Sequence, residues 1–161
     1  MKSYSAKADI SFYKSTLKDM KTFVKRWFDT GIYPNSISVS LLLLRVIVGI
    51  LMLTHGYGKL LILFGDEPIQ FADPIGIGVT ASLVLTVLAE FVASIFLIVG
   101  FATRFSAIPL LFTMLVAALI VHANDGFAFK ELPLLYATIY LVIAITGAGK
   151  YSVDSFISKK L

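Results

Sequence analysis

Four long apolar stretches dominate the chain beyond residue 36, and polar residues, glycines or prolines separate them. The first two are long enough to cross ~30 Å of hydrocarbon, which takes ~20 helical residues. The last two are shorter and would extend into their flanks. The pattern predicts an all-α, four-helix transmembrane bundle, with three spans as the main alternative. The predicted spans cover roughly residues Ile37–Phe64, Ile77–Val99, Ser106–Ala123 and Leu132–Thr146.

A second pattern precedes the spans. Residues 8–28 carry apolar side chains at intervals of three and four, which form one helical stripe, and lysines occupy the other faces. Basic amphipathic helices beside a span typically lie in the membrane interface, so we predict an N-terminal interfacial helix. Packing on a partner or on the bundle is the alternative. The stripe consists of Ile10, Tyr13, Leu17, Met20, Val24 and Trp27.

These patterns divide the chain into three parts. Residues 1–36 form the predicted amphipathic helix and linker, residues 37–154 the membrane domain, and residues 155–161 a tail. Of the 161 residues, 58% are hydrophobic, which is too apolar for an ordinary soluble domain and excludes disorder. Cysteine is absent, so this chain by itself forms no disulfide, binds no metal through thiolates and carries no dithiol chemistry.

The net charge of +4 is unevenly distributed, because half of the fourteen basic residues precede the first span. Beside a membrane span such a cluster indicates orientation and contact with anionic membrane lipids rather than with nucleic acid. Basic residues also occur in the connection between the second and third spans and at the C-terminus, whereas the connection between the first and second spans is acidic. The positive-inside rule therefore predicts that both termini are cytoplasmic. The N-terminal cluster is Lys2, Lys7, Lys14, Lys18, Lys21, Lys25 and Arg26.

The first span contains three polar residues that are costly in hydrocarbon: Arg45, His55 and Lys59. On a helix they fall within an arc of about 80°, which favours one face turned toward the bundle interior. At 1.5 Å per residue, Arg45 lies about 12 Å from the cytoplasmic start of its span, and Glu90 about 14 Å from the cytoplasmic end of the second span. We therefore predict an Arg45–Glu90 ion pair, which either binds a ligand or only aligns the two helices.

His55 and Lys59 lie toward the outer end of their span, and His122 ends the third span on the same side. The sequence leaves three interpretations of this cluster open. The residues bind a quinone or similar head group, they bind a metal with a carboxylate, or they are structural, with Lys59 reaching the interface and the histidines capping helices. Two histidines without a spacing signature are weak evidence for metal, so no metal site is predicted.

Four segments of the chain, read in order, form a recognisable set: LLLRVIVGILMLTHGYGKL, LAEFVASIFLIVGFATRFSA, VHANDGFAF and LYATIYLVIAITGAGKYSVD. Taken together, these segments resemble the DoxX family of small bacterial membrane proteins. The resemblance covers about residues 41–154, and the basic N-terminus lies outside it.

The resemblance implies a four-helix bundle in the bacterial cytoplasmic (inner) membrane, and some relatives look like subunits of membrane redox complexes. Carried over by motif, the family-type polar residues are Arg45, His55, Lys59, Glu90, Arg104, His122 and Asp154. Arg104 and Asp154 both lie at predicted cytoplasmic ends of spans. We predict a structural ion pair between them, which at a solvated edge contributes only ~0–1 kcal/mol.

We therefore expect an inner-membrane protein that serves as a subunit of a membrane redox complex, with a quinone-type or other small-ligand site at Arg45, His55, Lys59, Glu90 and His122. No flavin or haem motif is present, so no covalently bound cofactor is expected, and the sequence leaves open whether the protein is an enzyme. The expected partners are membrane lipids and another membrane subunit or a second copy of the chain. The alternative is a non-enzymatic accessory or assembly subunit. A third hypothesis is a small carrier or lipid-binding protein, with Arg45–Glu90 as a proton-linked pair.

Overall fold

The computed structural model describes residues 13–20, 22, 23, 25 and 27–160. Within these residues it is helical and contains no strand, as the apolar pattern predicts. Four helices are long and apolar enough to cross a membrane, so the three-span alternative is wrong. They cover Asn35–Leu63, Val79–Val99, Thr103–Val121 and Phe127–Thr146.

The first and last spans are single α-helices, α2 (Asn35–Leu63) and α6 (Phe127–Thr146). Each of the two middle spans contains one wider π-helical turn, a feature that frequently marks functional sites. The second span consists of α3 (Val79–Val87), the π turn η1 (Leu88–Val92) and α4 (Ala93–Val99). The third span consists of α5 (Thr103–Val116) and the π turn η2 (Ala117–Val121).

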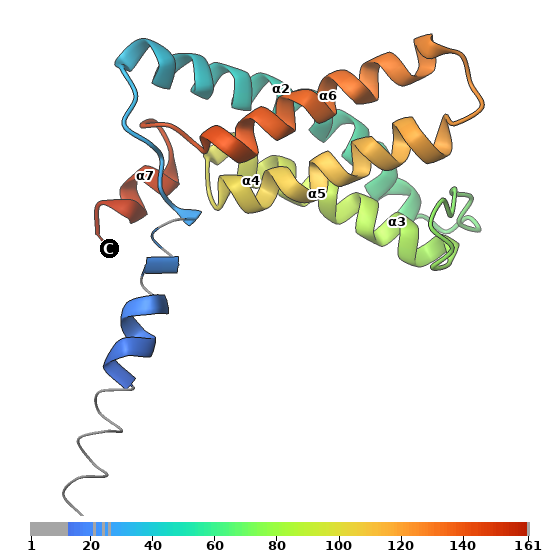
Figure 1. Cartoon of the computed structure of the whole chain (residues 1–161). Helices are drawn as coiled ribbons and strands as arrows, with labels where there is room; N and C mark the ends of the chain where they lie inside the picture. Colours follow the sequence, from blue (N-terminus) through green and yellow to red (C-terminus); the bar gives the residue numbers. More distant parts are fainter. Residues whose placement is uncertain (1–12, 21, 24, 26, 161) are drawn as a thin grey trace, which may run out of the picture.

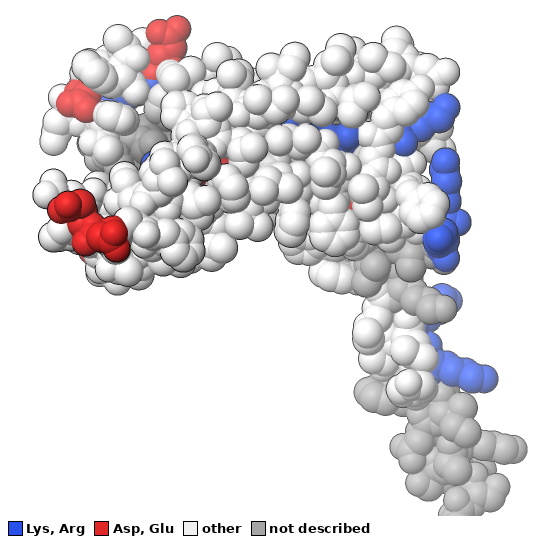
Figure 2. Space-filling view, turned by 180° about the vertical axis from the view of Figure 1, so that it is seen from behind, with Lys and Arg blue, Asp and Glu red and all other residues white. Residues whose placement is uncertain are grey.

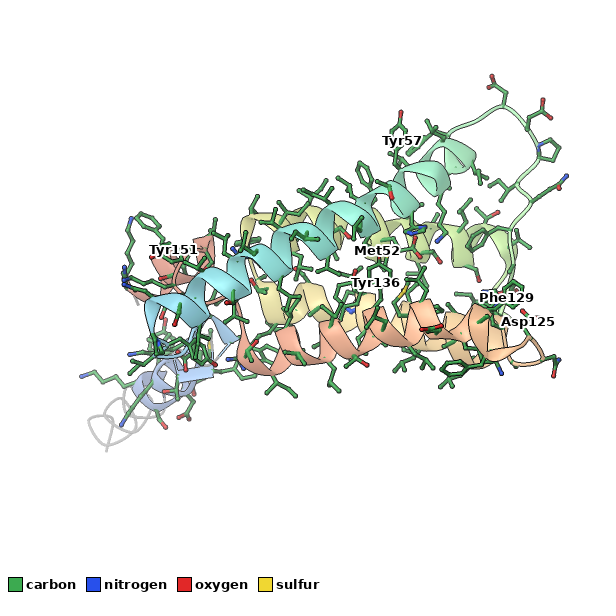
Figure 3. The ribbon with its side chains drawn as sticks, turned by 90° about the horizontal axis from the view of Figure 1, so that it is seen from above. Met52, Tyr57, Asp125, Phe129, Tyr136 and Tyr151 are labelled. Atoms are coloured by element: carbon green, nitrogen blue, oxygen red, sulfur yellow. The ribbon has the colours of Figure 1, made fainter. Side chains whose placement is uncertain are left out.

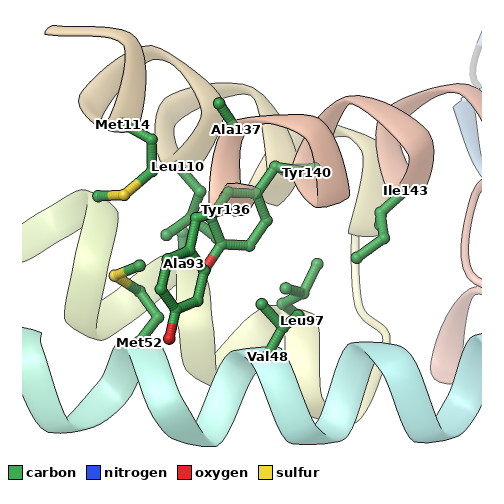
Figure 4. Packing of buried hydrophobic residues seen from close by; sticks show 11 residues of the cluster. Val48, Met52, Ala93, Leu97, Leu110, Met114, Tyr136, Ala137, Tyr140 and Ile143 are labelled. Atoms are coloured by element: carbon green, nitrogen blue, oxygen red, sulfur yellow. The ribbon is translucent and has the colours of Figure 1, made fainter. Parts of the chain in front are cut away.

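The spans pack in chain order, with α2 against the second span, the second against the third, and α5 against α6. The first and last spans touch little and cross each other at an angle (Figure 1). The buried core lies between all four spans (Figure 4). Since lipid tails are as apolar as leucine, close packing rather than hydrophobic transfer holds such a core together. The core residues are Val48, Met52, Ala93, Leu97, Ala107, Leu110, Met114, Tyr136, Ala137, Tyr140 and Ile143.

After α6 the chain turns back across the end of the bundle. The predicted end of the last span at Thr146 is confirmed, because α6 ends there and Gly147 follows with φ +81°. A short helix, α7 (Val153–Ser158), then begins with the Ser152 hydroxyl accepting a hydrogen bond from the Ser155 amide at 3.1 Å. The predicted tail boundary at residue 155 thus falls inside α7, whose residues Asp154 and Ser155 are buried.

The N-terminal segment is helical from residue 13 to 20 and extends away from the bundle at a steep angle to the spans (Figure 1). It lies at the same end as α7. Its side chains Tyr13, Met20 and Phe23 are more than half exposed, which suits an interfacial helix, although interfacial placement stays a prediction. The predicted positions Lys2, Lys7, Ile10, Lys21, Val24 and Arg26 lie outside the described residues.

Charge is segregated along the bundle (Figure 2). Lysine and arginine side chains gather at the end where α2 begins and α6 finishes, which we call the basic end. Aspartate and glutamate side chains gather at the opposite end, which we call the acidic end. The acidic end carries the connection of residues 64–78 and the connection of residues 122–126.

Candidate functional site

Near the acidic end an ion pair joins the first two spans. The Lys59 ammonium of α2 donates to Oε2 of Glu90, which lies in the π turn η1. The Glu90 side chain is 3% exposed and that of Lys59 27%, so the carboxylate is buried and the amine is only partly covered. Removing one partner of a buried pair costs about 3–5 kcal/mol, because the other charge is left uncompensated. Each residue therefore holds the other in place.

The predicted Arg45–Glu90 pair is wrong, because Glu90 pairs with Lys59 instead. Similar depth of the Cα atoms was a poor guide, since side chains on a helix point toward its N-terminus. The Arg45 side chain therefore reaches toward the basic end, where α2 begins, whereas Lys59 reaches back toward mid-membrane. Glu90 belongs to an antiparallel span, so its side chain points toward the acidic end and meets Lys59.

Arg45 is instead part of the closure of the basic end. Its two terminal guanidinium nitrogens donate to the carbonyl oxygens of Ala148 and Tyr151, each at 2.6 Å. The side chain is 1% exposed. Arg45 therefore satisfies backbone carbonyls that the turn after α6 leaves without helical partners, and its role in this structure is to hold the C-terminal segment on the bundle.

The predicted Arg104–Asp154 ion pair is not formed among the described residues. Asp154 is buried and accepts hydrogen bonds from the Ala102 and Thr103 amides, at 2.7 and 2.9 Å. These are free amides at the start of α5, where a carboxylate is favoured by both hydrogen bonding and the helix dipole. Arg104 donates to the Asp29 carbonyl at 3.2 Å. The pairing is therefore wrong, while the structural role predicted for both residues agrees with their contacts.

The ion pair lines a cavity of about 200 Å³ between the four spans. Met52 and Tyr136 lie between α2 and α6 at this depth, whereas Tyr57 points away from the bundle (Figure 3). Of the predicted ligand-binding residues, the structure brings His55, Lys59, Glu90 and His122 to this cavity and leaves Arg45 outside it. We call it the head-group cavity; its lining is Met52, His55, Lys59, Glu90, Met114, Ala117, His122, Leu132, Pro133 and Tyr136.

Several polar groups of the head-group cavity have hydrogen-bonding capacity to spare. Among the described residues, neither the ring nitrogens of His55 nor the hydroxyl of Tyr136 has a hydrogen-bond partner, although the two rings meet edge to face at 6.5 Å. The Lys59 ammonium has three donors and uses one of them on Glu90. The His122 ring binds Asp125 through Nδ1 at 2.7 Å, which leaves its other nitrogen free. The cavity can therefore bind a polar group without breaking an existing contact.

A second cavity of about 230 Å³ lies on the other side of the ion pair, beneath the connection of residues 64–78. It shares Lys59, Glu90, Ala117 and His122 with the head-group cavity. We call it the loop cavity. The ion pair thus faces two cavities.

The site depends on close approach of α2 to the π turn η1. A Cβ atom placed on Gly56 would lie 2.6 Å from the Glu90 carbonyl carbon, closer than real side chains approach a backbone. A Cβ atom on Gly58 would meet nothing within 4 Å. The absence of a side chain at Gly56 therefore allows the backbone of Glu90 to lie directly against α2, close to Lys59.

Sequence reasoning missed Tyr136 and Met52 as cavity residues. In the sequence, Tyr136 is indistinguishable from any other aromatic residue of an apolar span. The structure places it opposite His55 and stacks its ring on Tyr140, with the ring centres 6.1 Å apart, and these contacts identify it as a cavity residue. A hydroxyl on the same helical face as the buried Tyr140 was the available signal. Within the described residues, no group of three or more His, Asp or Glu side chains is placed to hold a metal ion.

Comparison with known proteins gives the chain a family. The DoxX family model matches residues 40–123. The inner membrane protein YqjF of Escherichia coli (strain K12) is 32% identical over 126 residues, which cover 76% of this chain and 95% of that protein. An uncharacterized protein of Haemophilus influenzae is 32% identical over 124 residues, which cover 73% of this chain and 90% of that protein. No solved structure matches the chain. With this match and four helices suited to spanning a membrane, the chain belongs to the DoxX family of membrane proteins.

Proposed function

We propose that the protein binds the polar head group of a membrane-soluble small molecule, of the quinone type, in the head-group cavity, and that it does so as a subunit of an inner-membrane redox complex. The observation that carries the proposal is the convergence of unused hydrogen-bond donors on one cavity that the first and last spans leave partly open. A quinone ring offers two carbonyl oxygens, which only accept hydrogen bonds. Lys59, Tyr136 and the histidines are able to donate to them.

The chemistry of the site supports binding rather than electron transfer by this chain alone. Cysteine is absent, and the sequence contains no flavin or haem motif, so electrons would come from a partner protein. Glu90 is already neutralised by Lys59, and an uncharged head group adds no further charge to the membrane interior. The role of the cavity residues is to bind the ring, orient it and keep it at a defined depth.

The test is the quinone content of the protein purified in mild detergent from its own membranes. We expect near-stoichiometric quinone with the wild-type protein, measured by extraction and mass spectrometry. His55→Ala should lower the occupancy at least tenfold, because it removes a group that lines the cavity. Tyr57→Ala is the matched control, since Tyr57 lies two residues away and points away from the bundle. Equal quinone content in wild type, His55→Ala and Tyr57→Ala would contradict the proposal.

The orientation proposed with this function has both termini in the cytoplasm, which places the head-group cavity toward the outer face. The segregation of basic and acidic side chains in Figure 2 supports it. Because the chain has no cysteine, single cysteines report topology directly. In spheroplasts, a membrane-impermeant maleimide should label Asp66→Cys, whereas it should label Lys159→Cys only after the membrane is permeabilised. The reverse pattern would invert the proposed orientation.

A second candidate is an accessory subunit whose N-terminal helix contacts another protein. The observation in its favour is the set of exposed apolar side chains Tyr13, Met20 and Phe23 on the N-terminal segment that extends away from the bundle. Replacing all three with serine in the full chain should release the protein from a larger complex on native gels while the bundle stays folded. An unchanged complex would contradict this candidate.

A further inference from the structure

An apolar groove of about 180 Å³ lies between the second and third spans, beside the loop cavity. Leu85 and Phe112 line it and are 53% and 57% exposed, so in a membrane the groove opens toward lipid. Pro74 and Ile77, from the connection of residues 64–78, line the groove toward the acidic end. We call it the tail groove.

Polar atoms along the tail groove are already satisfied by the protein. The Thr86 hydroxyl donates to the Ser82 carbonyl at 2.7 Å, and the Thr113 hydroxyl donates to the Pro109 carbonyl at 2.9 Å. The Ser82 hydroxyl donates to Asp73 at 2.7 Å. An occupant therefore finds methyl and methylene groups and no free hydrogen-bonding group, which suits hydrocarbon.

The tail groove continues into the polar site. It shares Pro74, Thr86, Thr113 and Val116 with the loop cavity, which in turn shares the Lys59–Glu90 pair with the head-group cavity. The π turn η1 places consecutive residues on the two sides of this path, with Ala89 lining the tail groove and Glu90 lining both polar cavities. The three cavities thus form one continuous path, which is polar at the head-group cavity and apolar at the tail groove.

We infer that the ligand is a long-tailed amphiphile, with its head group at Lys59 and Glu90 and its hydrocarbon tail leaving the protein between α3 and α5. This inference rests on the proposed function and adds to it the route of the tail. The tail occupies a groove lined by Leu85, Thr113 and Val116, and does not run along the lipid-facing surface of α6. The ion pair lies where head and tail join, so it sets the depth of the ring in the membrane.

The test uses a ubiquinone analogue whose decyl tail carries a photoreactive diazirine, with the full-length protein in lipid nanodiscs. After irradiation, mass spectrometry of peptides should locate the cross-links on residues 85–89 and 109–116. Excess ubiquinone-0, which has the head group and no tail, should abolish these cross-links, because displacing the head group releases the tail. Cross-links spread evenly over all lipid-facing helices and unaffected by ubiquinone-0 would overturn the inference.

Thr113→Phe should fill the tail groove and lower the specific cross-linking at least fivefold. Thr138→Phe is the matched control, because Thr138 donates to the carbonyl four residues earlier in the same way but lies on α6, away from the tail groove. A thermal denaturation midpoint close to that of the wild-type protein would show that Thr113→Phe is folded. Equal cross-linking in the two variants would overturn the inference.

Failure of this inference and failure of the proposed function give different results. If wild-type protein co-purifies with quinone and His55→Ala does not, but the cross-links avoid the groove, the tail route alone is wrong. If the wild-type protein neither co-purifies with quinone nor binds ubiquinone-0, the proposed function is wrong and the tail route is overturned with it.

Discussion

The two ends of the bundle both contain buried charges, but they use them differently. At the basic end, Arg45 donates to two backbone carbonyls and Asp154 accepts from two backbone amides, so the charges hold chain segments together. At the acidic end, Lys59 and Glu90 pair with each other beside two cavities, and neighbouring polar groups keep unused hydrogen-bonding capacity. The difference shows that a charge within a span does not by itself mark a binding site; spare hydrogen-bonding capacity beside a cavity is the better indicator.

The largest expected loss of stability comes from a substitution at the basic end. Arg45→Met should lower the free energy of unfolding by about 4 kcal/mol, since the Ala148 and Tyr151 carbonyls lose their partners and each unsatisfied buried group costs about 1–3 kcal/mol. Denaturation in detergent by heat or dodecyl sulfate measures the loss. Lys150→Met is the control, because Lys150 lies in the same turn with its side chain exposed. Quinone content per folded molecule should stay unchanged, and its loss would contradict the separation of the two ends.

The next largest loss of stability is expected from substitutions of the ion pair at the acidic end. Lys59→Met should cost about 3 kcal/mol, because it leaves the buried Glu90 carboxylate unpaired. Glu90→Gln should cost less, since the partly exposed Lys59 amine is able to reach water or lipid head groups. Here quinone binding should fall together with stability, unlike the Arg45 variant. A double-mutant cycle that combines Lys59→Met with Glu90→Gln checks the result, and additive losses would mean that the two side chains are not coupled.

The third effect sharpens the comparison by changing the acidic end without removing a charge. Gly56→Ala should destabilise the protein by about 2 kcal/mol, because the added methyl group overlaps the backbone at Glu90. Gly58→Ala, two residues along the same helix, should be neutral or slightly stabilising, since its added methyl group meets nothing. Thermal denaturation of both variants decides the question. Equal behaviour would show that α2 and η1 are not in close contact.

The smallest effect concerns the connection that covers the loop cavity. The pKa of Asp73 lies below its usual range, chiefly because the Ser82 hydroxyl donates to it and also because the Gly78, Ile77 and Gly76 amides do. A lowered pKa in the folded state stabilises the fold above the ordinary aspartate pKa of ~3.9, and the contribution is lost as the pH falls through the folded-state pKa. Denaturation midpoints at pH 7 and pH 3 should differ more in wild type than in Asp73→Asn. An identical pH dependence would contradict this role of Asp73.

Several features of the site could be predicted from the sequence because they depend on local periodicity. His55 and Lys59 are four residues apart, so any helix places them on one face, and both line the head-group cavity. His122 follows the third span, which runs in the same direction as the first because successive spans alternate, so it lies at the same end of the bundle as Lys59. The partner of Glu90 could not be predicted in this way. Whether Glu90 pairs with Arg45 or with Lys59 depends on the direction of the side chains and on the π turn. The depth of a residue along its span gives neither.

The sequence by itself determined the four spans and the end of α6, because the cost of exposing polar groups to lipid leaves a long apolar stretch with one choice of structure. Only the tertiary structure decided which charges meet, which glycine allows close approach, and which side chains keep free donors. Those outcomes depend on contacts between segments distant in sequence, such as Arg45 with Ala148 and Lys59 with Glu90. Spacing along one helix carries no information about what a neighbouring helix presents to it.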